Sequence, residues 1–264
     1  MTASVRQFPD LCYAAIPGYR PLELDLYLPE GDGPWPVVVH VHGGGWQRGS
    51  RRHPLSRLGP DFYDRLAGYG LAVAAIDYRL SGEARFPAQL EDVRAAVGWV
   101  HDRAASHDLD PSRVFLWGDS AGGHLALLAG LTGAKVHGIV AWFPVTDLAG
   151  LPADIAAAGG VPDPGPQSRE ALLLGAPAGI VPDLARQASP LAHAGPDAPP
   201  VLLMHGDADD MVPAAQSVRL AEALRAAGAD VELVLVPGAT HMWDGARDVA
   251  AIVRRSAEFV RAHG

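Results

Sequence analysis

Hydrophobic residues along the chain gather in short runs, and helix-like patterns separate most of these runs. The runs have the length of strands and lie near residues 11–15, 22–28, 36–42, 71–77, 112–118, 137–143, 200–206 and 231–236. Apolar residues recur at helical spacing near 60–69, 86–107, 120–130, 214–227 and 246–262. This alternation predicts an α/β fold with a mostly parallel, eight-stranded sheet flanked by helices.

Two parts of the chain depart from the alternation. Pro17-Gly18 joins the first two runs and is a turn-forming pair, so an antiparallel hairpin is expected at one edge of the sheet. Residues 149–199 are dense in Ala, Gly and Pro, with one short amphipathic piece at 168–174. So long a connection is uncommon and usually functional. We expect a single domain over residues 1–264, with 149–199 as a short cap between strands six and seven; a loose surface excursion is the alternative.

Composition and charge narrow the class of partner. The chain has 264 residues, of which 48% are hydrophobic and 19% charged, and this excludes a disordered protein. No apolar stretch approaches the ~20 residues that span a bilayer. The formal net charge of −9 argues against nucleic acid and anionic membranes, and favours a small molecule.

Cysteine and histidine usage argues against disulfides and metal. Cys12 is the only cysteine, and the histidines lack the spacing of metal ligands, so no internal disulfide and no metal site are expected. The N-terminal segment lacks the apolar stretch of a secretory signal, which predicts a cytoplasmic location.

The segment Gly118-Asp119-Ser120-Ala121-Gly122 stands between a strand-like run and a helix-like one. A sharp strand-to-helix turn of this kind exposes the serine as a nucleophile elbow. The flanking glycines leave space around the bent backbone. A plain strand-helix turn is the alternative, so the elbow interpretation depends on whether the chain supplies partners for Ser120.

A serine nucleophile needs a general base and an acid that orients the base, in the chain order Ser, Asp, His. His241 follows the last strand-like run and precedes the last helix, which is the expected place of the base. Asp207, Asp209 and Asp210 follow the seventh run, at the end of a parallel strand where such sheets assemble their sites. His193 lies in the expected cap without support from chain order, and the remaining histidines, His53 among them, are expected to be structural or solvated.

Backbone donors for a developing oxyanion are predicted in the loop after the third strand. His42-Gly43-Gly44-Gly45-Trp46 has the glycine content that lets a backbone approach a substrate closely, and the Ala121 amide would supply the other half. Apolar residues beside strand ends predict a substrate-binding surface, with core packing as the alternative. These residues are Trp46, Trp142, Met211 and Trp243.

Taken together, these motifs give the chain a resemblance to the α/β-hydrolase superfamily over nearly its whole length. Within it the chain resembles the bacterial feruloyl and acetyl-xylan esterase-like (BD-FAE-like) group, which is related to hormone-sensitive-lipase-like carboxylesterases. The residues that carry the resemblance are His42 to Trp46, Asp77 to Leu80, Phe86 to Gln89 with Glu91 to Val93, Gly118 to Leu125, Ala188 to Pro190, Pro199-Pro200, His205 to Pro213 and His241.

The resemblance implies a serine carboxylesterase that works through an acyl-enzyme and needs no cofactor. The expected cap is too short to enclose long acyl chains, which predicts short- to medium-chain esters as substrates. In that family the acid lies four residues before the proline of Asp-x-x-Val-Pro, which selects Asp209 here and leaves Asp207 and Asp210 as second choices. By the same resemblance Gly44, Gly45 and Ala121 form the oxyanion hole, and Gly43 is the alternative to Gly45. The expected partner is a small-molecule ester, and a homodimer is kept open.

Three other functions share parts of this pattern. A kynurenine-formamidase-like amidase has the same loop, elbow and chain order. A peptidase of the prolyl-oligopeptidase type normally carries an added domain, for which 264 residues leave no room. A non-catalytic ligand receptor of hydrolase fold, like the gibberellin receptors, lacks the catalytic histidine, and His241 in its expected place argues against it.

Overall fold

A computed structural model of the chain describes residues 5–52 and 54–264. Residues 1–4 and His53, which was expected to be solvated, lie outside the described residues. Eight strands form one sheet in the order β1-β2-β4-β3-β5-β6-β7-β8. The strands are β1 (Arg6–Ala14), β2 (Leu22–Leu28), β3 (Trp35–Val41), β4 (Ala72–Ile76), β5 (Leu109–Asp119), β6 (Gly138–Trp142), β7 (Val201–Gly206) and β8 (Val231–Val236).

The predicted hairpin is confirmed, because β1 pairs antiparallel with β2. The strand β2 also pairs antiparallel with β4, and all the other neighbouring strands are parallel. The central strands β4, β6 and β7 are buried along their whole length. This explains their near-continuous apolar sequences, since parallel strands are covered on both faces.

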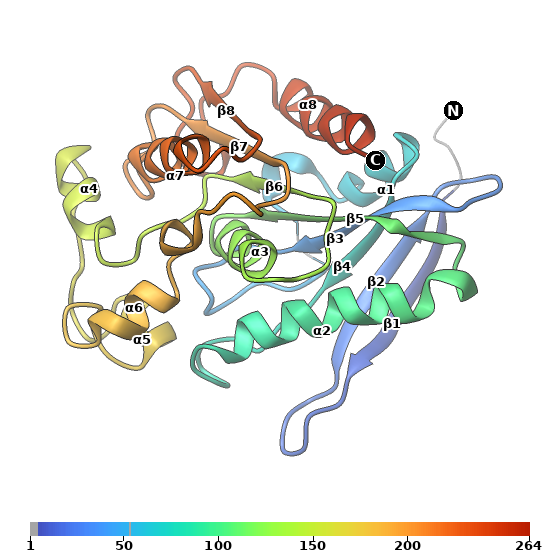
Figure 1. The fold of residues 1–264 in the computed structure, drawn as a ribbon, viewed down its shortest axis with the longest axis horizontal. Coiled ribbons are helices and arrows are strands. Elements are labelled where there is room, and N and C mark those ends of the chain that lie inside the picture. Colours follow the sequence, from blue (N-terminus) through green and yellow to red (C-terminus); the bar gives the residue numbers. More distant parts are fainter. Residues whose placement is uncertain (1–4, 53) are drawn as a thin grey trace.

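Helices cover both faces of the sheet (Figure 1). On one face lie α2 (Ala88–Arg103), α3 (Ala121–Leu131) and α7 (Ala215–Ala226), and on the other lie α1 (Phe62–Gly68) and α8 (Val249–Ala262). Alternate residues of each strand therefore enter separate cores: Ile139 and Ala141 of β6 pack under α3, whereas Val140 and Trp142 pack under α1 and α8. No helix in the described residues combines the length and the apolar character needed to cross a membrane.

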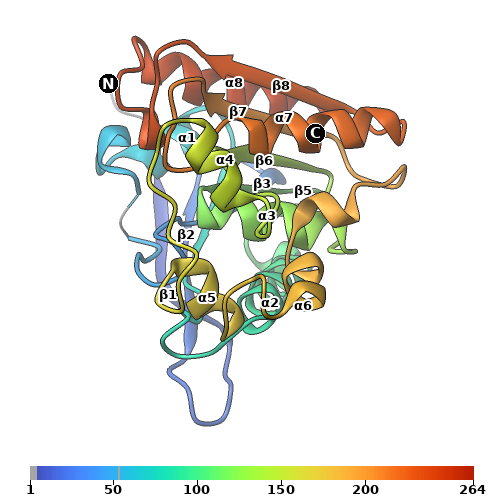
Figure 2. The same ribbon diagram turned by 90° about the vertical axis from the view of Figure 1, so that its left-hand side faces the viewer.

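The insertion 149–199 lies between β6 and β7, as the sequence predicts, but it contains more structure than one amphipathic piece. It forms α4 (Leu151–Ala157), α5 (Arg169–Leu174), α6 (Pro182–Gln187) and the 3-10 turn η3 (Pro190–His193). All three helices lie at the same end of the molecule, at the left of Figure 1 and toward the viewer in Figure 2, with α4 apart from α5 and α6. Leu151 and Leu173 enter the core below, so the insertion packs onto the rest of the chain.

Candidate active site

Ser120 occupies the turn between β5 and α3. Its backbone angles, φ 52° and ψ −117°, are unusual for a residue with a Cβ atom, and such strain concentrates at functional sites. A Cβ atom added to Gly118 would lie 2.3 Å from the Gly122 carbonyl group, and one added to Gly122 would lie 2.0 Å from the Val41 oxygen. Only glycine fits both places, so the two glycines allow α3 to start directly behind Ser120 and against β3.

Three loops bring Ser120, His241 and Asp209 together. His241 Nε2 lies 3.0 Å from Ser120 Oγ, and His241 Nδ1 lies 2.7 Å from Asp209 Oδ2. A carboxylate only accepts hydrogen bonds, so Nδ1 carries the proton and donates to Asp209, and Nε2 accepts from the serine hydroxyl. The imidazole is thereby held in the tautomer that can take up the serine proton.

The Asp209 carboxylate is nearly buried and is held on both oxygens. Its Oδ1 accepts from the backbone N–H groups of Met211 and Val212, at 3.0 and 2.9 Å. Burial by itself raises the pKa of Asp209, but the hydrogen bonds from His205, His241 and Val212 outweigh it and bring the pKa below its ordinary value. Asp209 is therefore ionised throughout the neutral range.

Neither of the other two carboxylates occupies this place. Asp207 is exposed and accepts a hydrogen bond from the Gly238 N–H at 2.7 Å. Asp210 is exposed and lines the wall of the neighbouring cavity. The structure thus puts Asp209 alone among the three against His241.

His205 supports the acid from below, as a structural histidine. Its Nδ1 accepts from the Ser217 hydroxyl at 2.7 Å, and its Nε2 donates to the Val212 oxygen at 2.7 Å. The same Nε2 lies 3.5 Å from Asp209 Oδ2. The ring is fully buried. It therefore fixes the loop that carries Asp209, in agreement with the structural role expected from the sequence.

The glycine-rich loop after β3 meets the N-terminus of α3. Gly44 and Gly45 have φ angles of 115° and 62°, which favour glycine. Gly45 and Ala121 line the cavity beside Ser120, whereas Gly44 forms the turn and accepts from the Gln47 and Arg48 N–H groups at 3.2 and 3.3 Å. As the first residue of α3, Ala121 has an N–H group without a partner inside the helix.

Gly43 faces away from the cavity, toward the buried Asp119 side chain. A Cβ atom at Gly43 would lie 2.3 Å from Asp119 Oδ2. Burial raises the pKa of Asp119 to about 7, against the opposing effect of the Gly43 and Asp119 backbone N–H groups. This orientation favours Gly45 over Gly43 as the donor next to Ser120.

A cavity of about 500 Å³ opens beside Ser120. The insertion supplies much of its wall, from α4, from α5 and from the chain between them. The Arg169 side chain passes over the oxyanion loop, so closely that a Cβ atom at Gly45 would lie 2.6 Å from Arg169 Cδ, and its Nη1 lies 3.5 Å from Met211 Sδ. Glu170 also lines the cavity, and burial raises its pKa. The cavity is therefore polar as well as apolar.

Comparison with models of known families shows to which family the chain belongs. The model of the BD-FAE family matches residues 24–224, which is most of the chain. This chain belongs to the BD-FAE family. The eight-stranded sheet and its solved relatives identify the fold as that of an α/β-hydrolase, in agreement with the sequence prediction.

Individual relatives of this BD-FAE chain are esterases. Esterase LipQ of Mycobacterium tuberculosis (strain ATCC 25618 / H37Rv) is 32% identical over 259 residues, which cover 94% of this chain and 59% of LipQ. Esterase LipC of the same strain is 32% identical over 227 residues, which cover 81% of this chain and 55% of LipC. The chain thus spans little more than half the length of these two relatives.

Two solved structures resemble the chain over almost its full length. A truncated form of a carbohydrate esterase from gut microbiota has a TM-score of 0.85 and 28% identity, covering 99% of this chain and 97% of that one. Thermogutta terrifontis esterase 2 phosphonylated by sarin has a TM-score of 0.76 and 25% identity, covering 99% of this chain and 95% of that one.

In this BD-FAE chain, two of the four residues predicted to bind substrate do not line the cavity beside Ser120. Trp142 and Trp243 are fully buried, and neither is among the described residues that line the cavity. Their rings pack edge to face, with centroids 5.6 Å apart, and Trp142 Nε1 donates to Ser256 Oγ at 3.0 Å. Both side chains thus belong to the core on the α1 and α8 side of the sheet, which is the packing alternative that the sequence left open.

The other two predicted binding residues line the cavity in different ways. Met211 is 40% exposed and lies at the wall. Trp46 is only 1% exposed and donates from Nε1 to His124 Nδ1 at 3.2 Å. His124 in turn donates from Nε2 to the Ala188 oxygen at 2.6 Å. Trp46 therefore ties the oxyanion loop to α3 and to the end of the insertion.

Sequence reasoning missed the residues that the insertion supplies, Leu151, Ile155, Arg169 and Glu170. The amphipathic piece at 168–174 was the one pattern that could have indicated α5. Among residues 5–52 and 54–264, no three His, Cys, Asp or Glu side chains come together as metal ligands would.

Proposed function

We propose that this protein is a serine carboxylesterase that hydrolyses short- to medium-chain carboxylic esters through an acyl-enzyme. The observation that carries the proposal is the hydrogen-bonded line from Ser120 Oγ through His241 to Asp209, with distances of 3.0 and 2.7 Å, beside an open cavity. A nucleophile, a base and an orienting acid in this order are what ester hydrolysis by serine requires.

In the proposed mechanism Ser120 Oγ attacks the ester carbonyl carbon while His241 Nε2 takes the hydroxyl proton. The imidazolium that forms is stabilised by the ionised Asp209 and then donates its proton to the leaving alcohol. Water enters, loses a proton to His241 and attacks the acyl carbonyl, which releases the acid and restores Ser120. The same three groups thus serve both halves of the reaction.

Negative charge on the carbonyl oxygen would be stabilised by backbone N–H groups of Gly45 and Ala121, with Gly44 as the third donor predicted from the family. Gly45 and Ala121 line the same cavity as Ser120. Loss of one such donor costs roughly 3–4 kcal/mol in the barrier. We further propose that the insertion 149–199 is a cap within a single domain, because its side chains form the cavity wall and its leucines enter the common core.

The cap supports a limit on acyl length. Its helices α4, α5 and α6 have only seven, six and six residues, and the Arg169 side chain crosses the cavity from the oxyanion loop to Met211. We expect turnover of p-nitrophenyl acetate and butyrate to exceed that of the decanoate. Faster hydrolysis of the decanoate would contradict this limit.

The test of function is a substrate panel with matched variants. Wild type, Ser120→Ala and His241→Ala would be assayed on p-nitrophenyl esters and on N-formylkynurenine, with circular dichroism to check folding. We expect both variants to lose nearly all ester turnover. Formamide turnover above that of every ester would make the protein an amidase instead. Binding of esters without turnover by the wild type would favour a receptor.

Two further expectations are proposed with the enzyme. The single cysteine, Cys12, supports a cytoplasmic location, since disulfides belong to oxidising compartments. Cell fractionation tests the location. A homodimer stays a prediction, which light scattering on the purified protein checks.

A further inference from the structure

The oxyanion loop is rich in glycine, and Trp46 alone does not fix both of its ends. It runs from Gly43 to Gly49 between the end of β3 and Ser50, and glycines occupy four of its seven positions. Glycine has wide conformational freedom, so such a segment needs contacts from outside to keep one conformation. Preorganised donors are what make an oxyanion hole effective. The groups that anchor this loop therefore bear on the proposed reaction.

The far end of the loop folds back onto its beginning. Gly49 has a φ of 106°, and a Cβ atom there would lie 2.4 Å from His42 Nδ1 and 2.6 Å from the Gly43 oxygen. The His42 ring is itself stacked on Tyr78, with ring centroids 4.4 Å apart. A shift of the chain after Gly49 would consequently displace the start of the oxyanion loop.

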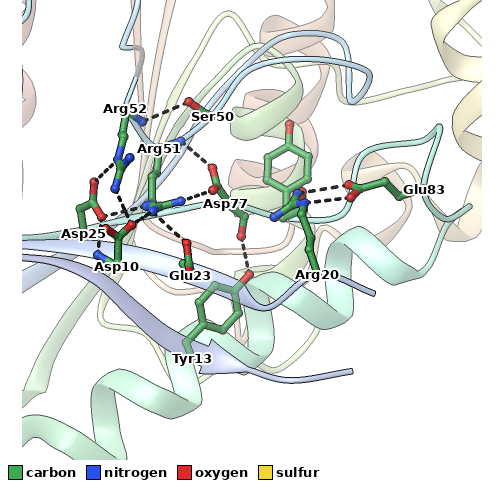
Figure 3. Close-up of polar contacts among 11 residues, drawn as sticks. Asp10, Tyr13, Arg20, Glu23, Asp25, Ser50, Arg51, Arg52, Asp77 and Glu83 are labelled. Carbon is green, nitrogen blue, oxygen red and sulfur yellow. Dashed lines mark hydrogen bonds and ion pairs between the residues drawn. The ribbon is translucent and has the colours of Figure 1, made fainter. Parts of the chain in front are cut away.

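Arg51, two residues after Gly49, is bound by four carboxylates (Figure 3). Its backbone N–H donates to Asp77 Oδ1 at 2.7 Å, its Nε donates to Asp25 Oδ1 at 2.8 Å, and its Nη2 donates to Glu23 Oε2 at 3.0 Å. The two Nη atoms also donate to Asp77 and Asp10. These partners come from β1, β2 and the end of β4, so one side chain joins the loop to three strands.

The Arg51 guanidinium is buried, which separates it from an ordinary surface ion pair. Its side chain is 7% exposed, and those of Asp25 and Asp77 are 8% and 12% exposed. Burial by itself lowers the pKa of Arg51, but Asp25 and Asp77 raise it above its ordinary value. Charge-assisted bonds to a planar guanidinium are strong and directional. The adjacent Arg52 contacts Asp25 and Asp10 as well, yet its side chain is 51% exposed.

We infer that Arg51 is a positioning residue, which holds the oxyanion loop in the conformation that stabilises the transition state. The inference rests on the proposed esterase function. Arg51 itself is not among the described residues that line the cavity beside Ser120. It acts through Gly49 and His42, which keep the Gly45 N–H beside the reacting carbonyl.

The test is Arg51→Lys, which keeps the positive charge but replaces the planar fork by a single ammonium group. One ammonium cannot reach all the oxygens that the guanidinium binds, so the loop is expected to shift. A misplacement of about 1 Å costs on the order of 100-fold in rate. We expect kcat for p-nitrophenyl butyrate to fall by ~10- to 100-fold while KM changes by less than about threefold. The affinity for a trifluoromethyl ketone, which mimics the tetrahedral intermediate, should fall by a similar factor.

Arg52→Lys is the matched control, because it makes the same chemical change one residue away and shares two of the carboxylates. It is expected to keep kcat and inhibitor affinity within about twofold of wild type, as exposed ion pairs contribute little. If Arg51→Lys does not fold, Glu23→Gln removes the negative charge of one partner of Arg51. That variant should show a smaller loss of kcat and inhibitor affinity, with KM again nearly unchanged.

The outcomes separate positioning from stability alone. An Arg51→Lys enzyme that melts at a lower temperature but keeps the wild-type kcat and ketone affinity would overturn the inference. Equal kinetic losses in Arg51→Lys and Arg52→Lys would overturn it too, since only Arg51 is buried beneath the loop. If wild type hydrolyses no ester, the proposed function and this inference fail together.

Discussion

Asp209→Asn is the substitution whose effect the structure defines most closely. Asp209 Oδ1 accepts from two backbone N–H groups, so the carbonyl oxygen of an asparagine must take that place. The amide NH₂ then faces His241 Nδ1, which has to accept instead of donate. The imidazole proton moves to Nε2 and points at Ser120 Oγ, 3.0 Å away. An imidazole in that tautomer cannot take the serine proton.

The size of the effect follows from losing the base while keeping the rest of the site. In a serine triad, an asparagine that forces the wrong tautomer lowers kcat by about 10⁴-fold, which is about 5.4 kcal/mol at 1.36 kcal/mol per tenfold. Binding and the oxyanion donors remain, so KM should change little. The assay is p-nitrophenyl butyrate hydrolysis at pH 7 to 8, with the urea midpoint measured alongside to show that the variant folds.

Asp207→Asn is the control, because Asp207 is exposed. Within the described residues, its side chain accepts one hydrogen bond, from the Gly238 N–H group. It should retain wild-type turnover. Asp209→Asn within about tenfold of wild type would refute the tautomer argument, since loss of the base predicts a far larger drop. An inactive Asp207→Asn enzyme would show that the acid had been misassigned.

Two further predictions concern stability and its pH dependence. Gly122→Ala would place a Cβ atom 2.0 Å from the Val41 oxygen and should lower the melting temperature markedly. Gly98→Ala in α2 places a Cβ atom with nothing within 4 Å and should stabilise the protein by about 0.5–1 kcal/mol. Thermal unfolding of both variants checks this, and equal effects would contradict it. Burial lowers the pKa of His124 to about 4. Below pH 6.5 this side chain therefore binds more protons in the unfolded chain than in the folded one. The free energy of unfolding should consequently fall by up to ~1.4 kcal/mol per pH unit between pH 6.5 and 4. In urea titrations at pH 7 and pH 5, the free energy of unfolding of His124→Gln should depend less on pH than that of the wild type. An unchanged pH dependence would show that other groups cause it.

Strand-length apolar runs and chain order were enough to predict the sheet and the positions of its main functional loops. Each predicted run overlaps an observed strand, and His241 lies where the order Ser, Asp, His requires it. The elbow was predictable because Gly118 and Gly122 are required by contacts that no other residue allows. These features depend on local sequence and on the fixed order of parallel strands.

Other features depend on contacts that the sequence does not record. Residues alone could not choose among Asp207, Asp209 and Asp210, because the choice depends on which carboxylate accepts from the Met211 and Val212 N–H groups. The helices α4 and α6 escaped prediction because each is short, begins with a proline in its first turn and is held by tertiary packing. The position of Trp142 at a strand end did not show on which face of the sheet its side chain lies. The alternation of side chains along β6 determines that face.

The two ends of the insertion 149–199 are held close together by a hydrogen bond. Leu148 N–H donates to Ser189 Oγ at 3.0 Å, so the entry and exit of the segment are fastened to each other. The Ala188 oxygen, just before the exit, is fastened to His124 at 2.6 Å. These two fastenings leave the length of the segment free, whereas Leu151 and Leu173 still have to fill the core beneath it. A graft of residues 149–187 from another family member that keeps these core positions would replace much of the cavity wall while leaving Ser120, Asp209 and His241 in place.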